Sequence, residues 1–181
     1  MFDIKQFVPE CYVDSRVIQI LLNSKVGPNH SHGVGKVLNK LCEKLADYPA
    51  IAIIDQDPNK GPKPSVWNQF DLDSTLGKLD NYGFRLYKRA NFNQWVIEIV
   101  PEIERWILEA CAEVHINLED FNLPQNLVNF NMITKSCNIL ENKDFTNLMV
   151  QLIALESPRI IKLREVLIRK SGWEITKVRR F

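Results

Sequence analysis

The sequence lacks any apolar run close to the roughly 20 residues that a membrane-spanning helix needs, so no membrane partner is expected. Its first residues show no basic segment followed by an apolar one, and we therefore expect no signal peptide. An excess of charge of one sign is also lacking, because 23 Lys and Arg residues stand against 22 Asp and Glu residues. The chain as a whole is therefore not expected to attract nucleic acid by its net charge.

Closely spaced cysteines are lacking as well. The four cysteines, Cys11, Cys42, Cys111 and Cys137, form no CxxC pair and no cluster with histidine, which argues against a structural zinc site. A chain of this length buries roughly two-thirds of its unfolded surface without cross-links, so we expect reduced thiols and no disulfide framework. Reduced thiols are typical of cytoplasmic proteins, and the sequence favours that location.

The first half of the chain contains alternating strand and helix patterns. Residues 3–9 are predicted to form a strand, residues 13–22 a helix and residues 37–46 a second helix. The unbroken apolar run at 50–54 predicts a strand that is buried on both faces, as in a parallel sheet covered by helices. We expect this strand to be central, with the helices around Val17 and Leu41 covering its two faces.

The second half of the chain has a different character. Two more strands are predicted at 83–89 and 94–100, and helical spacing of apolar residues follows them. The sequence therefore predicts an α/β protein with a core at 1–100, in which a mainly parallel sheet is flanked by helices. Residues 101–181 are expected to form a helical C-terminal cap that packs on this core.

Acidic residues follow two of the predicted strands. Glu10 follows the first strand, and Asp55 and Asp57 follow the apolar one. Ligands bind beyond the carboxyl ends of strands in open parallel sheets, so the three carboxylates should converge if these strands are neighbours. Carboxylates suit Mg²⁺ or Mn²⁺, which polarises a phosphoryl oxygen, while Glu10 can act as a general acid or base. The alternative is that the aspartates only cap a helix or close a turn.

The order of these segments resembles the Toprim domain of topoisomerases, primases, OLD-family nucleases and small Toprim-like nucleases. The matching segments are Glu10–Asp14, Ala50–Asp57 and Ile97–Trp106, so the resemblance covers about the first 105 residues. It implies a Rossmann-like sheet, Glu10 as the general acid or base, and Asp55 and Asp57 as magnesium ligands. It also implies magnesium-dependent phosphoryl transfer, in particular a nuclease that acts on nucleic acid.

Two features depart from the Toprim pattern. Cys11 stands where the family usually has glycine, which lets a phosphate approach the backbone closely. The second strand of the family must be very short in this chain, around residues 25–26. The alternative function is a non-catalytic module of the same architecture, which engages a protein partner or nucleic acid through the helical cap and the basic residues near the C-terminus.

Several other residues are further candidates for the same site. His32 and Lys36 lie near the start of a predicted helix and are expected to bind phosphate, with a polar surface loop as the alternative. Asp14, Glu102 and Glu104 are additional acids, although the two glutamates also suit the first turn of a helix.

Basic residues gather near the C-terminus. Their pattern predicts either a solvated helix face or a phosphate-binding surface. The residues are Arg159, Lys162, Arg164, Arg169, Lys170, Lys177, Arg179 and Arg180.

Overall fold

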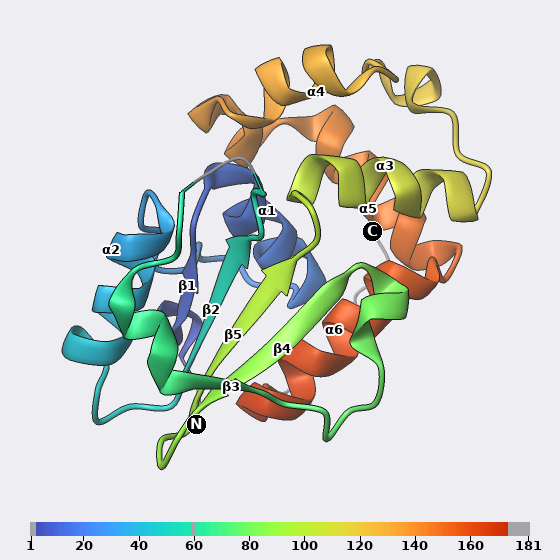
Figure 1. The fold of residues 1–181 in the computed structure, drawn as a ribbon. Helices are drawn as coiled ribbons and strands as arrows, with labels where there is room; N and C mark the ends of the chain where they lie inside the picture. The colour runs from blue at the N-terminus through green and yellow to red at the C-terminus, as the bar shows by residue number, and fades with distance from the viewer. Residues whose placement is uncertain (1–2, 59–60, 174–181) are drawn as a thin grey trace.

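The computed structural model describes residues 3–58 and 61–173, which form an α/β fold around a five-stranded sheet (Figure 1). The strand order is β1-β2-β5-β4-β3. β1, β2 and β5 are parallel neighbours, whereas β4 and β3 are antiparallel to the strands beside them. The sheet is therefore mixed, and the expected parallel arrangement holds only for three strands. The strands are β1 (Phe7–Pro9), β2 (Ala50–Asp55), β3 (Phe70–Leu72), β4 (Phe84–Arg89) and β5 (Gln94–Ile99).

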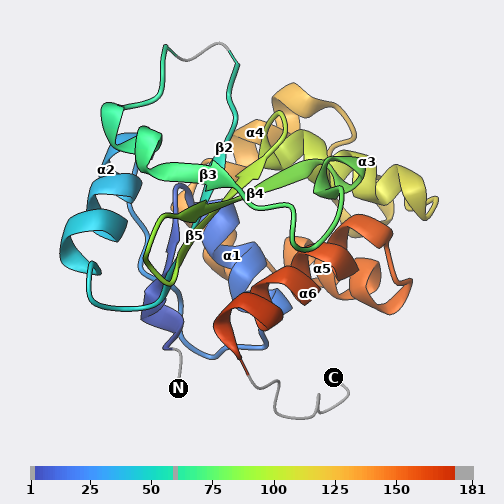
Figure 2. The same ribbon diagram turned by 60° about the horizontal axis from the view of Figure 1, so that its bottom comes forward.

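Helices flank both faces of this sheet. The α-helices are α1 (Tyr12–Leu21), α2 (Val34–Asn39), α3 (Ile103–Glu113), α4 (Leu127–Thr134), α5 (Lys143–Ala154) and α6 (Pro158–Ser171). Shorter helical turns are η1 (Ile4–Gln6), the π-helical η2 (Lys40–Lys44), η3 (Ser65–Gln69), η4 (Leu79–Tyr82), η5 (Leu118–Phe121) and η6 (Cys137–Glu141). Figure 2 shows α1, α5 and α6 gathered on one side of the sheet and α2 apart from them. No helix of the described residues is long and apolar enough to span a bilayer.

The apolar run of β2 lies between β1 and β5 and is buried on both faces. Ile51 and Ile53 pack in one apolar cluster with Val17 of α1. The residues that alternate with them pack in a second cluster with Leu41, which continues the helical segment begun by α2. The prediction of a central strand covered by these two helices is therefore confirmed.

The helices after β5 do not form a core of their own. Buried side chains of α3, α5 and α6, including Trp106, Leu152 and Leu163, belong to the same apolar cluster as Ile51 and Ile53. Residues 101–173 therefore complete the core of the sheet on the face that α1 also covers.

The first strand is shorter than predicted. Residues 4–6 form η1 because Asp3 caps this turn, its carboxylate accepting a hydrogen bond of 2.8 Å from the N–H of Lys5. The short strand expected around residues 25–26 is not formed. Instead, the N–H groups of Asn29 and Ser31 donate to the carbonyl oxygens of Phe7 and Pro9, so an irregular loop occupies the outer edge of β1.

Candidate functional site

The carboxyl ends of β1 and β2 lie side by side. Pro9 pairs with Ile53, and the next residue, Glu10, donates its N–H to the Ile53 carbonyl at 3.0 Å. The Oε2 atom of Glu10 accepts a hydrogen bond of 3.2 Å from the backbone N–H of Asp55. The two strands are therefore neighbours, as expected, and Glu10 contacts the segment that carries the two aspartates.

A pocket of about 340 Å³ opens at this end of the sheet. In Figure 1 the arrowheads of β2 and β5 point toward this end, where α3 begins. Five of its lining residues are acidic, and they come from three separate segments of the chain. The lining residues are Glu10, Cys11, Tyr12, His32, Gly33, Asp55, Asp57, Glu102, Glu104, Thr134 and Lys135. An adjoining pocket shares Glu10, Gly33 and Asp57 and extends along residues 61–64.

Asp55 has a structural role in addition to its place in the pocket. Its Oδ1 atom accepts a hydrogen bond of 2.9 Å from the N–H of Ile103, the first residue of α3. Asp57 adopts a left-handed backbone with φ of 47°, and its N–H donates to the carbonyl of Pro101 at 3.0 Å. The turn after β2 is thus fastened to the segment between β5 and α3, and the helix-capping alternative is realised at Asp55.

Asp14 lies behind the pocket and is almost fully buried. Its Oδ2 atom accepts a hydrogen bond of 3.0 Å from the N–H of Cys11, whose sulfur in turn accepts from the N–H of Asp14. The Oδ1 atom is buried and has no hydrogen-bond partner among the described residues. Burial raises the pKa of Asp14 to about 7, against the effect of the bonds with Cys11 and with a further contribution from Glu10 and Glu104.

Burial and neighbouring carboxylates also raise the pKa values of two groups near Asp14. Burial, followed by the charges of Asp14, Glu104 and Glu10, raises the pKa of Asp55 well above its usual range, although the bond from Ile103 opposes the rise. Burial and the neighbouring Asp14 also raise the pKa of the Cys11 thiol, so this group stays neutral and is a packing residue.

Glu104 connects this acidic group to the end of α4. It is 4% exposed, and its Oε1 atom accepts a hydrogen bond of 2.7 Å from the Thr134 hydroxyl. Thr134 and Lys135 therefore belong to the pocket, yet they lie about 80 positions beyond Asp55 in the sequence. No motif marks either residue, so only the packing of α4 against α3 identifies them.

The donor set of the pocket consists mainly of carboxylates. Within residues 3–58 and 61–173, no group of three or more His, Cys, Asp or Glu side chains is arranged to hold a metal ion. Magnesium, however, usually keeps several waters and takes only one or two protein carboxylates. Five carboxylates line the pocket, and nearby carboxylates contribute, after burial, to the raised pKa of Asp55. A hydrated cation in the pocket would favour the ionised form of Asp55.

His32 and Lys36 are not brought together in this pocket. The His32 ring lies at the rim, with its centroid 4.2 Å from that of His30 and 5.1 Å from that of Tyr12. Lys36, on α2, instead lines a separate hollow with Lys40 and Lys44. The two residues therefore do not form one phosphate site in this arrangement.

Most basic residues of α6 are engaged within the chain. Arg159 pairs with Glu109 and Glu113, and Lys170 pairs with Asp73 at 2.9 Å. These ion pairs fasten α6 to the rest of the protein. Three further residues of the expected basic surface, Lys177, Arg179 and Arg180, lie outside the described residues.

Comparison of the chain with protein-family models gives no match, and searches of curated proteins and of solved structures give none either.

Proposed function

We propose that the protein has a Toprim-like architecture and transfers phosphoryl groups with the help of magnesium or manganese, as a nuclease acting on nucleic acid. One observation carries this proposal. Glu10, Asp55 and Asp57 leave neighbouring parallel strands and line one pocket at the carboxyl ends of those strands. This is the position at which open α/β sheets bind their ligands.

Each acidic residue has a distinct part in the proposed reaction. Asp55 and Asp57 would hold the cation together with water molecules, since hard cations prefer carboxylate oxygens. The bound cation would neutralise charge on a phosphoryl oxygen and on the leaving oxygen. Glu10, oriented by the N–H of Asp55, transfers a proton to or from the reacting oxygen. Asp14, Glu102 and Glu104 add negative charge that favours cation binding.

The second candidate function is a non-catalytic module that binds a protein partner. The observation that favours it is an apolar face on α4, where Val128 and Met132 are 72% and 74% exposed one helical turn apart. This face lies on the helix whose last residue, Thr134, lines the acidic pocket. Such exposed apolar side chains are typical of surfaces that contact another protein.

The test of the first proposal is a melting series with and without Mg²⁺ or Mn²⁺, followed by cleavage assays on single- and double-stranded DNA and RNA. We expect metal at tenfold its dissociation constant to raise Tm by about 3 °C or more. Asp55→Asn and Asp57→Asn should abolish this shift while leaving the metal-free protein as stable or more stable, because they remove repulsion between carboxylates. Glu10→Gln should retain the metal shift and lose cleavage.

The matched control is Asp47→Asn, which changes an exposed aspartate in the turn before β2 and should leave the metal shift intact. If metal does not affect the unaltered protein, and the Asp55 and Asp57 variants are clearly destabilised, both aspartates are structural caps. The partner-binding function on α4 would then be the better account of the protein.

A further inference from the structure

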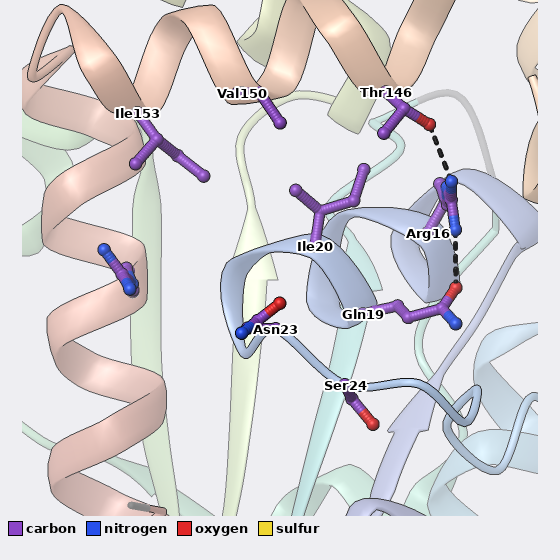
Figure 3. A pocket seen from close by; sticks show the side chains of 9 residues that line it. Arg16, Gln19, Ile20, Asn23, Ser24, Thr146, Val150 and Ile153 are labelled. Atoms are coloured by element: carbon purple, nitrogen blue, oxygen red, sulfur yellow. Dashed lines mark hydrogen bonds between the residues drawn. The ribbon is translucent and has the colours of Figure 1, made fainter. Parts of the chain in front are cut away.

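A second pocket, of about 280 Å³, lies between α1, α5 and α6 (Figure 3). It shares no lining residue with the acidic pocket. Its wall is mostly apolar, and in Figure 3 Ile20 of α1 faces Val150 and Ile153 of α5 across it. Two arginines, Arg16 and Arg164, also line it.

The guanidinium group of Arg16 is held in place by neutral groups. It donates to the Gln19 side chain at 2.9 Å and to the Thr146 hydroxyl at 2.6 Å, as the dashed lines in Figure 3 show. Its Nε atom is buried and has no acceptor among the described residues. The two hydrogen bonds thus orient the group, and its Nε is too deeply buried to meet a ligand in the pocket.

Neither arginine of this pocket has an acidic partner among the described residues. Arg164 donates from Nε to the carbonyl oxygen of Leu21 at 3.0 Å and makes no ion pair there. In contrast, Arg85 and Arg159 each pair with two carboxylates. The pocket therefore combines positive charge with an apolar wall and contains no counterion from the described chain.

An anion would neutralise the positive charge that no carboxylate of the described residues offsets in this pocket. Burial lowers the pKa of Arg16 from its usual value, and no carboxylate of the described residues offsets this cost. Guanidinium groups bind carboxylates through strong, directional hydrogen bonds. The apolar wall favours a ligand with an apolar body over an inorganic anion, and the volume is near the lower end of small-molecule sites, about 300 Å³.

We propose that this pocket binds a small carboxylate with an aliphatic or aromatic body. The carboxylate pairs with Arg16, the apolar body packs against Ile20, Val150 and Ile153, and Arg164 adds a second positive charge to the pocket. This site is independent of phosphoryl transfer, because none of its residues lines the acidic pocket.

The test is calorimetric titration of the full chain with straight-chain carboxylates from butanoate to octanoate, with octanamide as the neutral counterpart. We expect affinity to rise about fourfold for each added methylene group that the pocket buries. Octanoate should bind at least tenfold more tightly than octanamide. Arg16→Gln should weaken octanoate binding at least tenfold, and Arg164→Gln should weaken it by a smaller factor. Arg169→Gln is the matched control, because Arg169 is exposed on α6 outside the pocket, and it should leave binding unchanged.

A second variant tests the site without removing a buried arginine. Val150 is 38% exposed, so Val150→Asp should fold normally while placing an internal carboxylate beside the two arginines. We expect this variant to lose octanoate binding. Equal affinity for octanoate and octanamide, unchanged binding in Arg16→Gln and Val150→Asp, or no binding at any chain length would overturn the proposal.

Discussion

The carboxylate of Asp55 at the end of β2 accepts a hydrogen bond of 2.9 Å from the N–H of Ile103 at the start of α3. One side chain thus joins the strand that positions the acidic pocket to the helix that supplies Glu104. An asparagine at this position keeps the oxygen that accepts this bond and removes only the charge. For this reason, Asp55→Asn separates metal binding from helix capping, whereas alanine would remove both.

Stability without metal should fall as pH rises through the weakly acidic range. The pKa of Asp14 is raised from 3.8 to about 7, so the folded state binds this proton more tightly than the unfolded state does. Below about pH 3.8, the pKa in the unfolded state, Asp14 is protonated in both the folded and the unfolded protein. Between this pH and about 7, the free energy of unfolding falls as pH rises, and above about pH 7 it levels off. The contribution of Asp14 to this fall is at most ~4 kcal/mol.

Chemical denaturation at several pH values between about 4 and 8, in the presence of a chelator, measures this effect. Asp14→Asn should make the profile less steep over this range, and the raised pKa of Asp55 accounts for part of the slope that remains. Asp73 has the opposite sign, because its pKa is lowered to about 2, so its stabilising contribution is lost only in more acidic solution. A profile of Asp14→Asn that is as steep as that of the unaltered protein would contradict the prediction.

Gly83 should be among the residues least tolerant of substitution. Its backbone has φ of +71°, and a Cβ atom there would lie 2.8 Å from Cδ1 of Trp106 and would also meet the Arg159 guanidinium. We expect Gly83→Ala to cost more than about 2 kcal/mol, because backbone strain adds to the steric conflict.

The matched control for Gly83 is Gly77→Ala. Gly77 has a similar φ of +83°, but nothing lies within 4 Å of a Cβ atom built there. This variant should show the backbone cost alone, about 1 kcal/mol. Equal unfolding free energies for the two variants would show that the contact with Trp106 is unimportant.

Lys170 should stabilise the protein through Asp73. The two side chains are 2.9 Å apart, and the carboxylate of Asp73 is only 4% exposed. Lys170→Met should destabilise the protein by about 1–3 kcal/mol, because the buried carboxylate loses a charged donor. The hydrogen bonds from Thr75 remain and limit the loss. Urea denaturation measures it, and Arg169→Met on the same helix, at an exposed position, should have little effect.

The central part of the fold could be predicted because local pattern and topology agree there. Five apolar residues in a row suit only a buried element, and β2 is indeed covered on both faces. The juxtaposition of Glu10 and Asp55 followed from one assumption, that their strands are parallel neighbours, and this assumption is correct.

Other parts depend on contacts between distant segments. β3 has only three residues, two of them exposed, and forms because it pairs with β4, so its sequence shows no periodic pattern. At the N-terminus, Asp3 and Gln6 close a helical turn through their side chains, and this local bonding prevailed over the strand predicted there. Lys135 reaches the pocket only through the packing of α4, which no local pattern indicates.

The residues that line the acidic pocket extend along the sequence from Glu10 to Lys135, and α6 packs against β2. During synthesis on a ribosome, the acidic side chains are therefore made well before α4 can complete the pocket and before α6 can pack against β2. A nascent chain that ends near residue 100 holds Glu10, Asp55 and Asp57 but lacks the helices that cover Ile51 and Ile53 together with α1. The site is thus assembled only after the α4 segment has been made, and fragments that stop after β5 would be targets for chaperones and proteases.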